Sequence, residues 1–153
     1  MRPERRCSAV SGEVVLAGRR LALGVPETYM NDSGLAVRAL ARRYSLEDLS
    51  QLVVVHDELD LPVGTVRVKR GGGIAGHNGL RSVQSHLHSL EFLRVRVGVG
   101  RPPGRMAGAD YVLRRPSRAE ADELAAAFEV AADAVEAILA DGAEAAMNAF
   151  NGR

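Results

Sequence analysis

The chain has 153 residues, of which 46% are hydrophobic and 25% are charged, and its formal net charge is +1. This length and composition are typical of one globular domain and exclude a disordered or low-complexity protein. The single cysteine, Cys7, excludes an internal disulfide and favours a reducing compartment. No aliphatic run is long enough to cross a bilayer, and no signal-peptide core follows the basic residues 1–6. We therefore expect a cytoplasmic protein without a membrane partner.

The charge is divided unevenly along the chain. Residues 1–118 carry 19 Lys and Arg against 11 Asp and Glu, a balance of +8, whereas residues 119–153 carry one Arg against eight acids. A basic region of this size suits a polyanion such as RNA, because neutralised phosphates release counterions. An arginine-rich, well-solvated surface explains the same numbers equally well. Because only 4% of the residues are aromatic, a platform for stacking bases is not expected.

The first half of the chain predicts a hairpin, a helix and a buried strand. Two strands are expected at residues 9–16 and 20–25, joined by a tight turn around Gly18. Residues 34–44 have the apolar spacing of a helix. The run QLVVVH at residues 51–56 is continuously apolar, which is typical of a strand buried on both faces.

The second half of the chain predicts further strands and three helices. Strands are expected at residues 65–70 and 92–99, and helices at residues 78–90, 118–140 and shortly before residue 149. Ser117 and Glu120 have the spacing of a capping box for the long helix. Its buried stripe is expected to contain Leu124, Phe128, Ala131, Val135, Ile138 and Leu139. Together the elements predict an α/β fold, a single domain over residues 1–153, with one mixed, mostly parallel twisted sheet and helices on both faces.

Three polar residues fall where strands end or helices begin. Asp57 ends the most apolar strand, Asn31 follows the second strand, and Asn78 begins a helix after a glycine loop. Ligands of open α/β sheets bind outside the carboxyl ends of the strands, so we expect these side chains to meet at one edge. Each also has a structural interpretation, since asparagines commonly cap helices and an aspartate at a strand end commonly forms a turn.

Other kinds of site are less consistent with the sequence. Residues 71–76 fit the spacing G-x-G-x-x-G, but the preceding strand alternates and no acid ends the next strand, which argues against a dinucleotide site. No Gly-Lys-Ser/Thr loop is present for a Walker site. The acids near Asp57 have no second cluster of metal ligands. His86 and His88 are two residues apart on a predicted helix, so structural or solvent-exposed roles are expected for both.

Four segments of the sequence resemble motifs of the bacterial peptidyl-tRNA hydrolase family. They occur in the family's order and spacing, which makes the resemblance highly specific. The segments are PETYMNDSG at residues 26–34, HDELDLPVG at 56–64, GHNGLRS at 76–82 and VRVGVGRP at 95–102.

The resemblance implies hydrolysis of the ester that joins a peptide to the 3′ end of tRNA, without a metal or other cofactor. It implies that Asp57 orients and supports a catalytic histidine, and that Asn31 and Asn78 hydrogen-bond the peptidyl backbone or the attacking water. It implies that Tyr29 lines the groove near the tRNA end. The expected partner is the acceptor end of peptidyl-tRNA, and the expected state is a monomer.

The sequence departs from the family in one important respect. The family's G-N-P-G turn and T-R-H-N motif, whose histidine is the general base, do not occur in these 153 residues, so an N-terminally truncated domain is expected. His56 should point away from Asp57, and His77 is a weak substitute. Three interpretations remain: an enzyme of the family with a late start or a lost N-terminus, a non-catalytic tRNA- or RNA-binding relative that lacks the base, and a plain interaction domain. The retention of all three polar residues favours the first. For the 153 residues by themselves, we expect hydrolysis to be lost or severely reduced.

Overall fold

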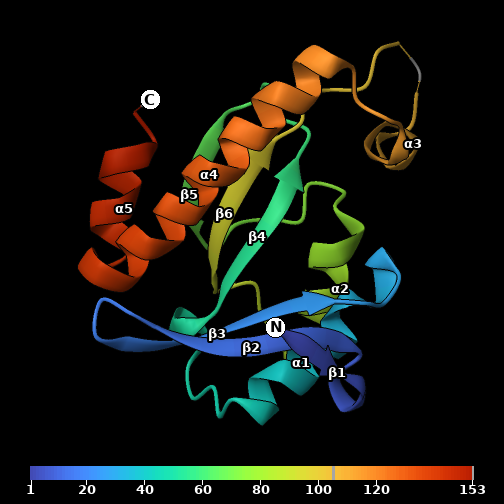
Figure 1. Ribbon diagram of the computed structural model, residues 1–153. Coiled ribbons are helices and arrows are strands. Elements are labelled where there is room, and N and C mark those ends of the chain that lie inside the picture. Colours follow the sequence, from blue (N-terminus) through green and yellow to red (C-terminus); the bar gives the residue numbers. More distant parts are fainter. Residues whose placement is uncertain (105, 153) are drawn as a thin grey trace. The chain divides into compact units, whose positions relative to one another are not determined.

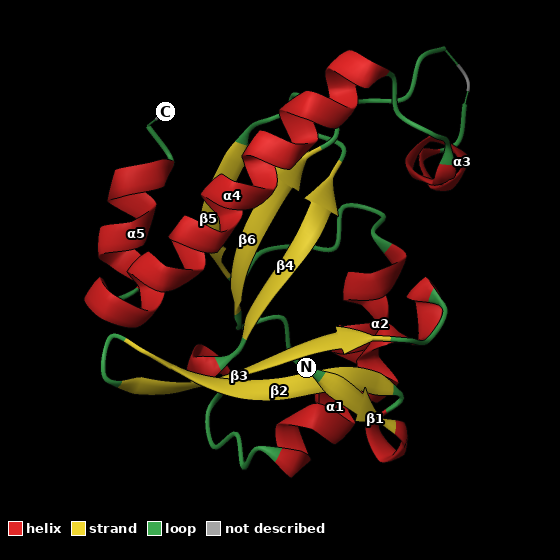
Figure 2. Ribbon diagram, viewed as in Figure 1, coloured by secondary structure: helices red, strands yellow, loops and turns green. Residues whose placement is uncertain are grey.

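The computed structural model describes residues 1–104 and 106–152 (Figures 1 and 2). The chain divides into two compact units, the first formed by residues 1–52 and 70–93 and the second by residues 53–69 and 94–153. Within the described residues, the strands form two three-stranded sheets. No helix in this part of the chain is long and apolar enough to cross a membrane.

The first unit begins with an antiparallel sheet of β1 (Arg2–Glu4), β2 (Ala9–Leu16) and β3 (Arg19–Pro26), in that order. The two residues between β2 and β3 are Ala17 and Gly18, with φ angles of 51° and 72°. A two-residue turn with positive φ at both positions matches the twist of paired strands, so it fixes the register of the hairpin. The predicted strands and their tight turn are confirmed.

The helices of the first unit include α1 (Ser33–Arg43), which packs against the hairpin (Figure 1), and α2 (Asn78–Leu87), which packs against α1. Short 3-10 turns complete the unit, namely η1 (Arg5–Cys7), η2 (Met30–Asp32) and η3 (Leu49–Gln51). The buried apolar cluster between α1 and the sheet is small and contains Cys7, Ala9 and Ala36. Small side chains let the helix lie close to the strands.

The second unit is built on β4 (Val53–Glu58), β5 (Val66–Arg70) and β6 (Leu93–Gly98), in the order β4-β6-β5. The amides of Leu93 and Val99 donate to the carbonyls of Leu52 and Glu58, with one constant offset, so β4 and β6 are parallel. The amide of Gly98 donates to Thr65, and the amide of Gly71 to Phe92, so β6 and β5 are antiparallel. This sheet is therefore mixed.

One face of this sheet is covered by α4 (Arg118–Asp141) and α5 (Ala143–Phe150), as Figure 1 shows, and the short α3 (Gly108–Leu113) precedes them. Ser117 caps α4 by accepting the amide of Glu120 at 3.2 Å, as the capping-box spacing predicted. The core between helices and strands contains nine buried residues, which are Val66, Val68, Val95, Val97, Ala127, Ala131, Ala134, Ala146 and Phe150.

The α/β class and the mixed sheet are confirmed, but the single, mostly parallel sheet is wrong. The described strands form two sheets, and antiparallel pairs outnumber the parallel pair because short connections join β1 to β2 and β2 to β3. The expectation of one sheet with helices on both faces is replaced by two sheets, each with helices packed on it inside its own unit.

Four local expectations also differ from the structure. Edge strand β4 is only partly buried, with Val55 51% exposed, whereas central β6 is the most buried strand even though its sequence alternates. Phe128 is 60% exposed, because alanines of α4 face the sheet instead. Helix α2 ends earlier than expected, at Leu87, since His88 adopts a left-handed conformation with φ 60°. Helix α3 was not predicted.

Candidate active site

Asn31 and Asn78 line one pocket of the first unit. Asn31 lies in η2, directly before α1, and Asn78 is the first residue of α2. The pocket has a volume of about 400 Å³, and both asparagines are exposed. Its remaining lining comes from α2 and consists of Arg81, Ser82, Ser85 and His86.

Two glycines allow the segments that carry the asparagines to approach each other. A Cβ at Gly34 would lie 2.1 Å from the carbonyl oxygen of Ser82, so only glycine fits between α1 and α2 at this point. The amide of Gly34 donates to the Ser82 hydroxyl at 2.8 Å, a buried contact. Near the other asparagine, a Cβ at Gly79 would lie 2.7 Å from the sulfur of Met30. These contacts hold the start of α1 against α2.

The asparagines do not serve as helix caps. The cap of α2 is His77, whose Nδ1 accepts the amide of Leu80 at 3.1 Å. Helix α1 follows Asp32, which makes no side-chain capping bond. Neither asparagine side chain hydrogen-bonds to another residue in the part of the chain that the structure describes. Two primary amides, each with donors and an acceptor, are therefore available to a bound molecule.

His86 also lines the pocket, and the structural or solvent-exposed role expected for it stays a prediction. Its Nδ1 lies 2.9 Å from the carbonyl oxygen of Ser82. A carbonyl can only accept, so Nδ1 carries the proton and Nε2 is the acceptor of the neutral ring. The sequence held a signal for this wall, since the polar residues follow a helical stripe of i, i+3, i+4, i+7 and i+8 from Asn78.

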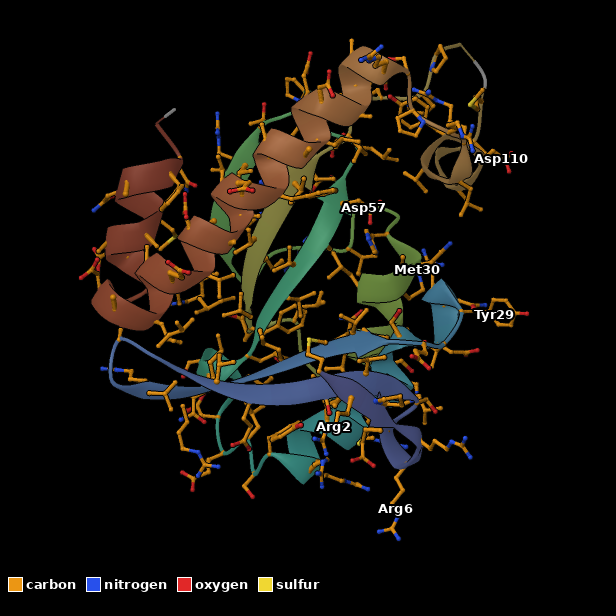
Figure 3. All side chains as sticks on the ribbon, viewed as in Figure 1. Arg2, Arg6, Tyr29, Met30, Asp57 and Asp110 are labelled. Carbon is orange, nitrogen blue, oxygen red and sulfur yellow. The ribbon has the colours of Figure 1, made fainter. Side chains whose placement is uncertain are left out.

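Asp57 lies in the second unit, near the end of β4, where Figure 3 labels it. It is partly buried, and its own carbonyl oxygen lies 2.8 Å from Nδ1 of His56. His56 itself is 9% exposed, more buried than Asp57, as expected for neighbours that alternate between the two faces of a strand. The expected meeting of Asp57 with the two asparagines stays a prediction.

The acids that follow Asp57 are held by arginines of the same unit. Glu58 accepts from Nε and an amino group of Arg96 at 3.0 and 2.9 Å, and Asp60 pairs with Arg101 at 2.8 Å. Burial alone would raise the pKa of Glu58, but the hydrogen bonds and charge of Arg96, helped by the Asp60 amide, lower it below its ordinary value. No group of three or more His, Cys, Asp or Glu side chains within the described ranges could hold a metal ion.

Tyr29 does not line the pocket. Its side chain is 85% exposed and points away from the ribbon in Figure 3. The neighbouring Thr28 is more enclosed, and its hydroxyl is buried without a hydrogen-bond partner among the described residues. The predicted contact of Tyr29 with the end of a tRNA would therefore be made by an exposed ring.

Comparisons with known proteins agree with the motifs. A family model described as peptidyl-tRNA hydrolase matches residues 1–153. The peptidyl-tRNA hydrolase of Rhodococcus erythropolis is 59% identical over 133 residues, which cover 87% of this chain and 70% of that protein. The one from Frankia casuarinae is 53% identical over 146 residues, covering 95% and 74%. The crystal structure of peptidyl-tRNA hydrolase from Acinetobacter baumannii matches with a TM-score of 0.90 and 31% identity, covering 98% and 76%. This chain belongs to the peptidyl-tRNA hydrolase family.

Proposed function

We propose that this chain acts on peptidyl-tRNA, in the reaction that cleaves the ester between peptide and tRNA and releases tRNA for reuse in translation. Family membership over the whole chain supports this activity. The observation that carries it at the level of residues is the pair of amide side chains, Asn31 and Asn78, which line one pocket and hydrogen-bond to no other residue that the structure describes. The proposed enzyme is a carboxylic ester hydrolase.

The chemistry of the ester explains why amides can serve it. Water attacks the ester carbonyl, a base takes its proton, and the ribose oxygen leaves with a proton. Asn31 and Asn78 can donate to a carbonyl oxygen on which charge develops, or accept from a peptide amide or the attacking water. We assign Asp57 the task of orienting and supporting a histidine base, and Tyr29 a contact with the end of the tRNA.

The four histidines present are poorly suited to be that base. His77 caps α2, His56 is buried, and His88 ends α2 in a left-handed conformation. His86 keeps Nε2 as an acceptor, but its Nδ1 faces a backbone carbonyl and no carboxylate lines its pocket to support a protonated ring. The family's T-R-H-N motif does not occur in these residues. We therefore expect residues 1–153 by themselves to bind the substrate and to hydrolyse it slowly. Slow hydrolysis with retained binding is also how the alternative, a non-catalytic RNA-binding relative, would behave.

Chemical rescue separates these two functions. Hydrolysis of N-acetyl-aminoacyl-tRNA is measured with residues 1–153 at increasing imidazole, with imidazole and tRNA alone as the background. If a site that lacks only its base is present, imidazole accelerates hydrolysis at least tenfold above the background, and Asn78→Ala removes the gain. If the protein adds nothing to the imidazole background, the hydrolase assignment fails for this chain and the binding function takes its place.

We further propose that residues 1–153 act as one functional domain and as a monomer in the cytoplasm, where peptidyl-tRNA is formed. The asparagine pocket supports the monomer, because all of its lining residues come from one unit of one chain and no second copy is needed to form it. Analytical ultracentrifugation with and without tRNA tests the assignment. Without tRNA a single species close to the chain's 16.3 kDa is expected, and with tRNA a complex that contains one protein chain per tRNA. A stable protein dimer in either sample would contradict it.

A further inference from the structure

The pocket of Asn31 and Asn78 is lined entirely by polar side chains, most of them from one face of α2. Apart from His86, whose ring proton is used on the Ser82 carbonyl, every lining residue can donate a hydrogen bond, and no carboxylate is among them. Asp32, which follows Asn31, does not line the pocket. A wall with one fixed positive charge, several donors and no carboxylate is suited to an anion rather than to a cation or an apolar group.

The positive charge in this wall is Arg81, and it is not neutralised. Arg81 is exposed and has no ion pair with another described residue. A second, smaller pocket of the first unit, of about 300 Å³, contains two arginines that differ in this respect. There Arg20 pairs with Glu13 at 2.6 Å, and Arg43 pairs with Glu4 at 3.1 Å. The contrast singles out the asparagine pocket as the one with an available charge.

His86 adds a group of different chemistry to the same wall. Because its Nδ1 donates to the Ser82 carbonyl, the neutral ring has Nε2 as its acceptor. An acceptor beside an arginine is poorly matched to a phosphodiester alone, because a phosphodiester has no proton to donate at neutral pH. It is well matched to a sugar hydroxyl next to a phosphate. The Ser85 hydroxyl can bond to either group.

We propose that this pocket holds a ribose-phosphate unit at the 3′ end of the tRNA, with the phosphate at Arg81 and a ribose hydroxyl at Nε2 of His86. The inference rests on the proposed function and deepens it, because it assigns the tRNA backbone, rather than the peptide, to the part of the pocket beyond the asparagines. Arg81 is then a binding residue for the substrate's phosphate, and its charge makes that contact sensitive to salt.

The first experiment measures binding of deacylated tRNA by residues 1–153 in filter-binding titrations at several salt concentrations. Arg81→Gln is expected to weaken binding roughly three- to tenfold at low salt and to reduce the salt slope by about one phosphate contact. The matched control is Arg42→Gln, an exposed arginine on α1 that lies outside the pocket. It should change the affinity less than about twofold. Equal effects of the two substitutions would overturn the inference.

The second experiment identifies the group that is bound. Backbone amide shifts of Asn78, Ser85 and His86 are followed by NMR during titration with adenosine, AMP and inorganic phosphate. AMP should shift these signals in the wild type and not in Arg81→Gln, and phosphate should do so more weakly because it lacks the sugar. If adenosine shifts the signals as strongly as AMP, the nucleoside binds without any contribution from the phosphate, and the ribose-phosphate assignment is wrong.

The two proposals fail in distinguishable ways. If the wild-type chain binds no tRNA at all, the proposed function is wrong for residues 1–153. If the chain binds tRNA normally and Arg81→Gln leaves both the affinity and the salt slope unchanged, the function stands and only the ribose-phosphate site is lost. His86→Gln, which keeps a side-chain acceptor, should retain more AMP binding than His86→Ala; the opposite order would remove His86 from the site.

Discussion

The two units of the chain maintain their structures by different means. In the first unit, α2 is joined to α1 by the contact at Gly34 and the bond from the Gly34 amide to Ser82, and to η2 by the contact at Gly79, and the apolar cluster is small. In the second unit, nine buried residues form a continuous core between α4, α5 and the β4-β6-β5 sheet. The asparagine pocket belongs to the unit with the smaller apolar cluster.

Because of this difference, we expect substitutions in the second unit to change stability and substitutions between α1 and α2 to change the pocket. Removal of apolar volume from the second unit should lower the free energy of unfolding without a specific effect on the pocket. Small changes between α1 and α2 should displace the asparagines relative to each other, because close packing leaves those helices one allowed separation. Substitutions chosen as pairs across the two units can test this division.

The largest expected loss of stability comes from the core of the second unit. Phe150 is 5% exposed, and Phe150→Ala should cost about 3–5 kcal/mol, through lost burial and the cavity left behind. The control is Phe128→Ala on α4, because Phe128 is 60% exposed and its loss should cost less than about 1 kcal/mol. Urea unfolding measures both. Similar costs at the two positions would mean that the core has been wrongly identified.

A matched pair of glycines compares the units directly. A Cβ at Gly34 would lie 2.1 Å from the Ser82 carbonyl oxygen, and a Cβ at Gly98 would lie 2.1 Å from that of Pro62. Each Gly→Ala change should therefore destabilise its unit by about 1–3 kcal/mol. At a temperature where both variants are folded, only Gly34→Ala should weaken tRNA binding. Equal losses of binding would remove the distinction between the units.

The chain end that follows α5 should make a smaller contribution. The side-chain amide of Asn151 accepts from the Val68 amide and donates to the Val68 carbonyl, both at 2.8 Å, and so pairs with edge strand β5 as another strand would. Asn151→Ala should cost about 1–3 kcal/mol, because partly buried backbone groups lose their partner. Asn151→Asp, which keeps only the acceptor, should be nearly as unstable. Hydrogen exchange at the Val68 amide reports the loss, and unchanged protection would contradict it.

The smallest expected effect is a dependence of stability on pH at Glu58. Its pKa in the folded chain is below the ordinary value of 4.5, so the unfolded state binds the proton more readily. The resulting stabilisation is present above about pH 4.5 and is lost as pH falls through the folded pKa. Glu58→Gln should flatten the curve of unfolding free energy between pH 3 and 6. Glu13→Gln, which breaks an exposed pair with Arg20, is the control and should lower the free energy of unfolding at neutral pH less than Glu58→Gln does; the reverse order would contradict this assignment.

Much of the fold could be predicted because local patterns were unambiguous. The hairpin of β2 and β3 was signalled by its turn at Gly18, and the start of α4 by the capping residues Ser117 and Glu120. Burial was harder to predict, because it depends on the position of a strand in its sheet. The alternating β6 is central and the apolar β4 is at an edge, an order that only long-range pairing decides.

The candidate site could be predicted in part. Asn31 and Asn78 were identified from their positions before helices and from the resemblance, and the structure brings both into one pocket. His86 was not predicted to line this pocket. Its spacing from His88 places those two residues on different sides of a helix, whereas its spacing from Asn78 places it on the same face as Asn78. No local pattern indicates that Gly34 fits under Ser82, because that contact joins residues 48 positions apart.

The central claim is that Asn31 and Asn78 act on one bound group, and a double-mutant cycle tests it most directly. Binding of a peptidyl-tRNA analogue with an amide in place of the ester is measured for Asn31→Ala, Asn78→Ala and the double variant, with circular dichroism to verify folding. Each single change should weaken binding, and the double change should cost less than their sum by roughly 0.5–3 kcal/mol, because the two amides share a ligand. Strictly additive losses, or no loss for either asparagine, would contradict the account.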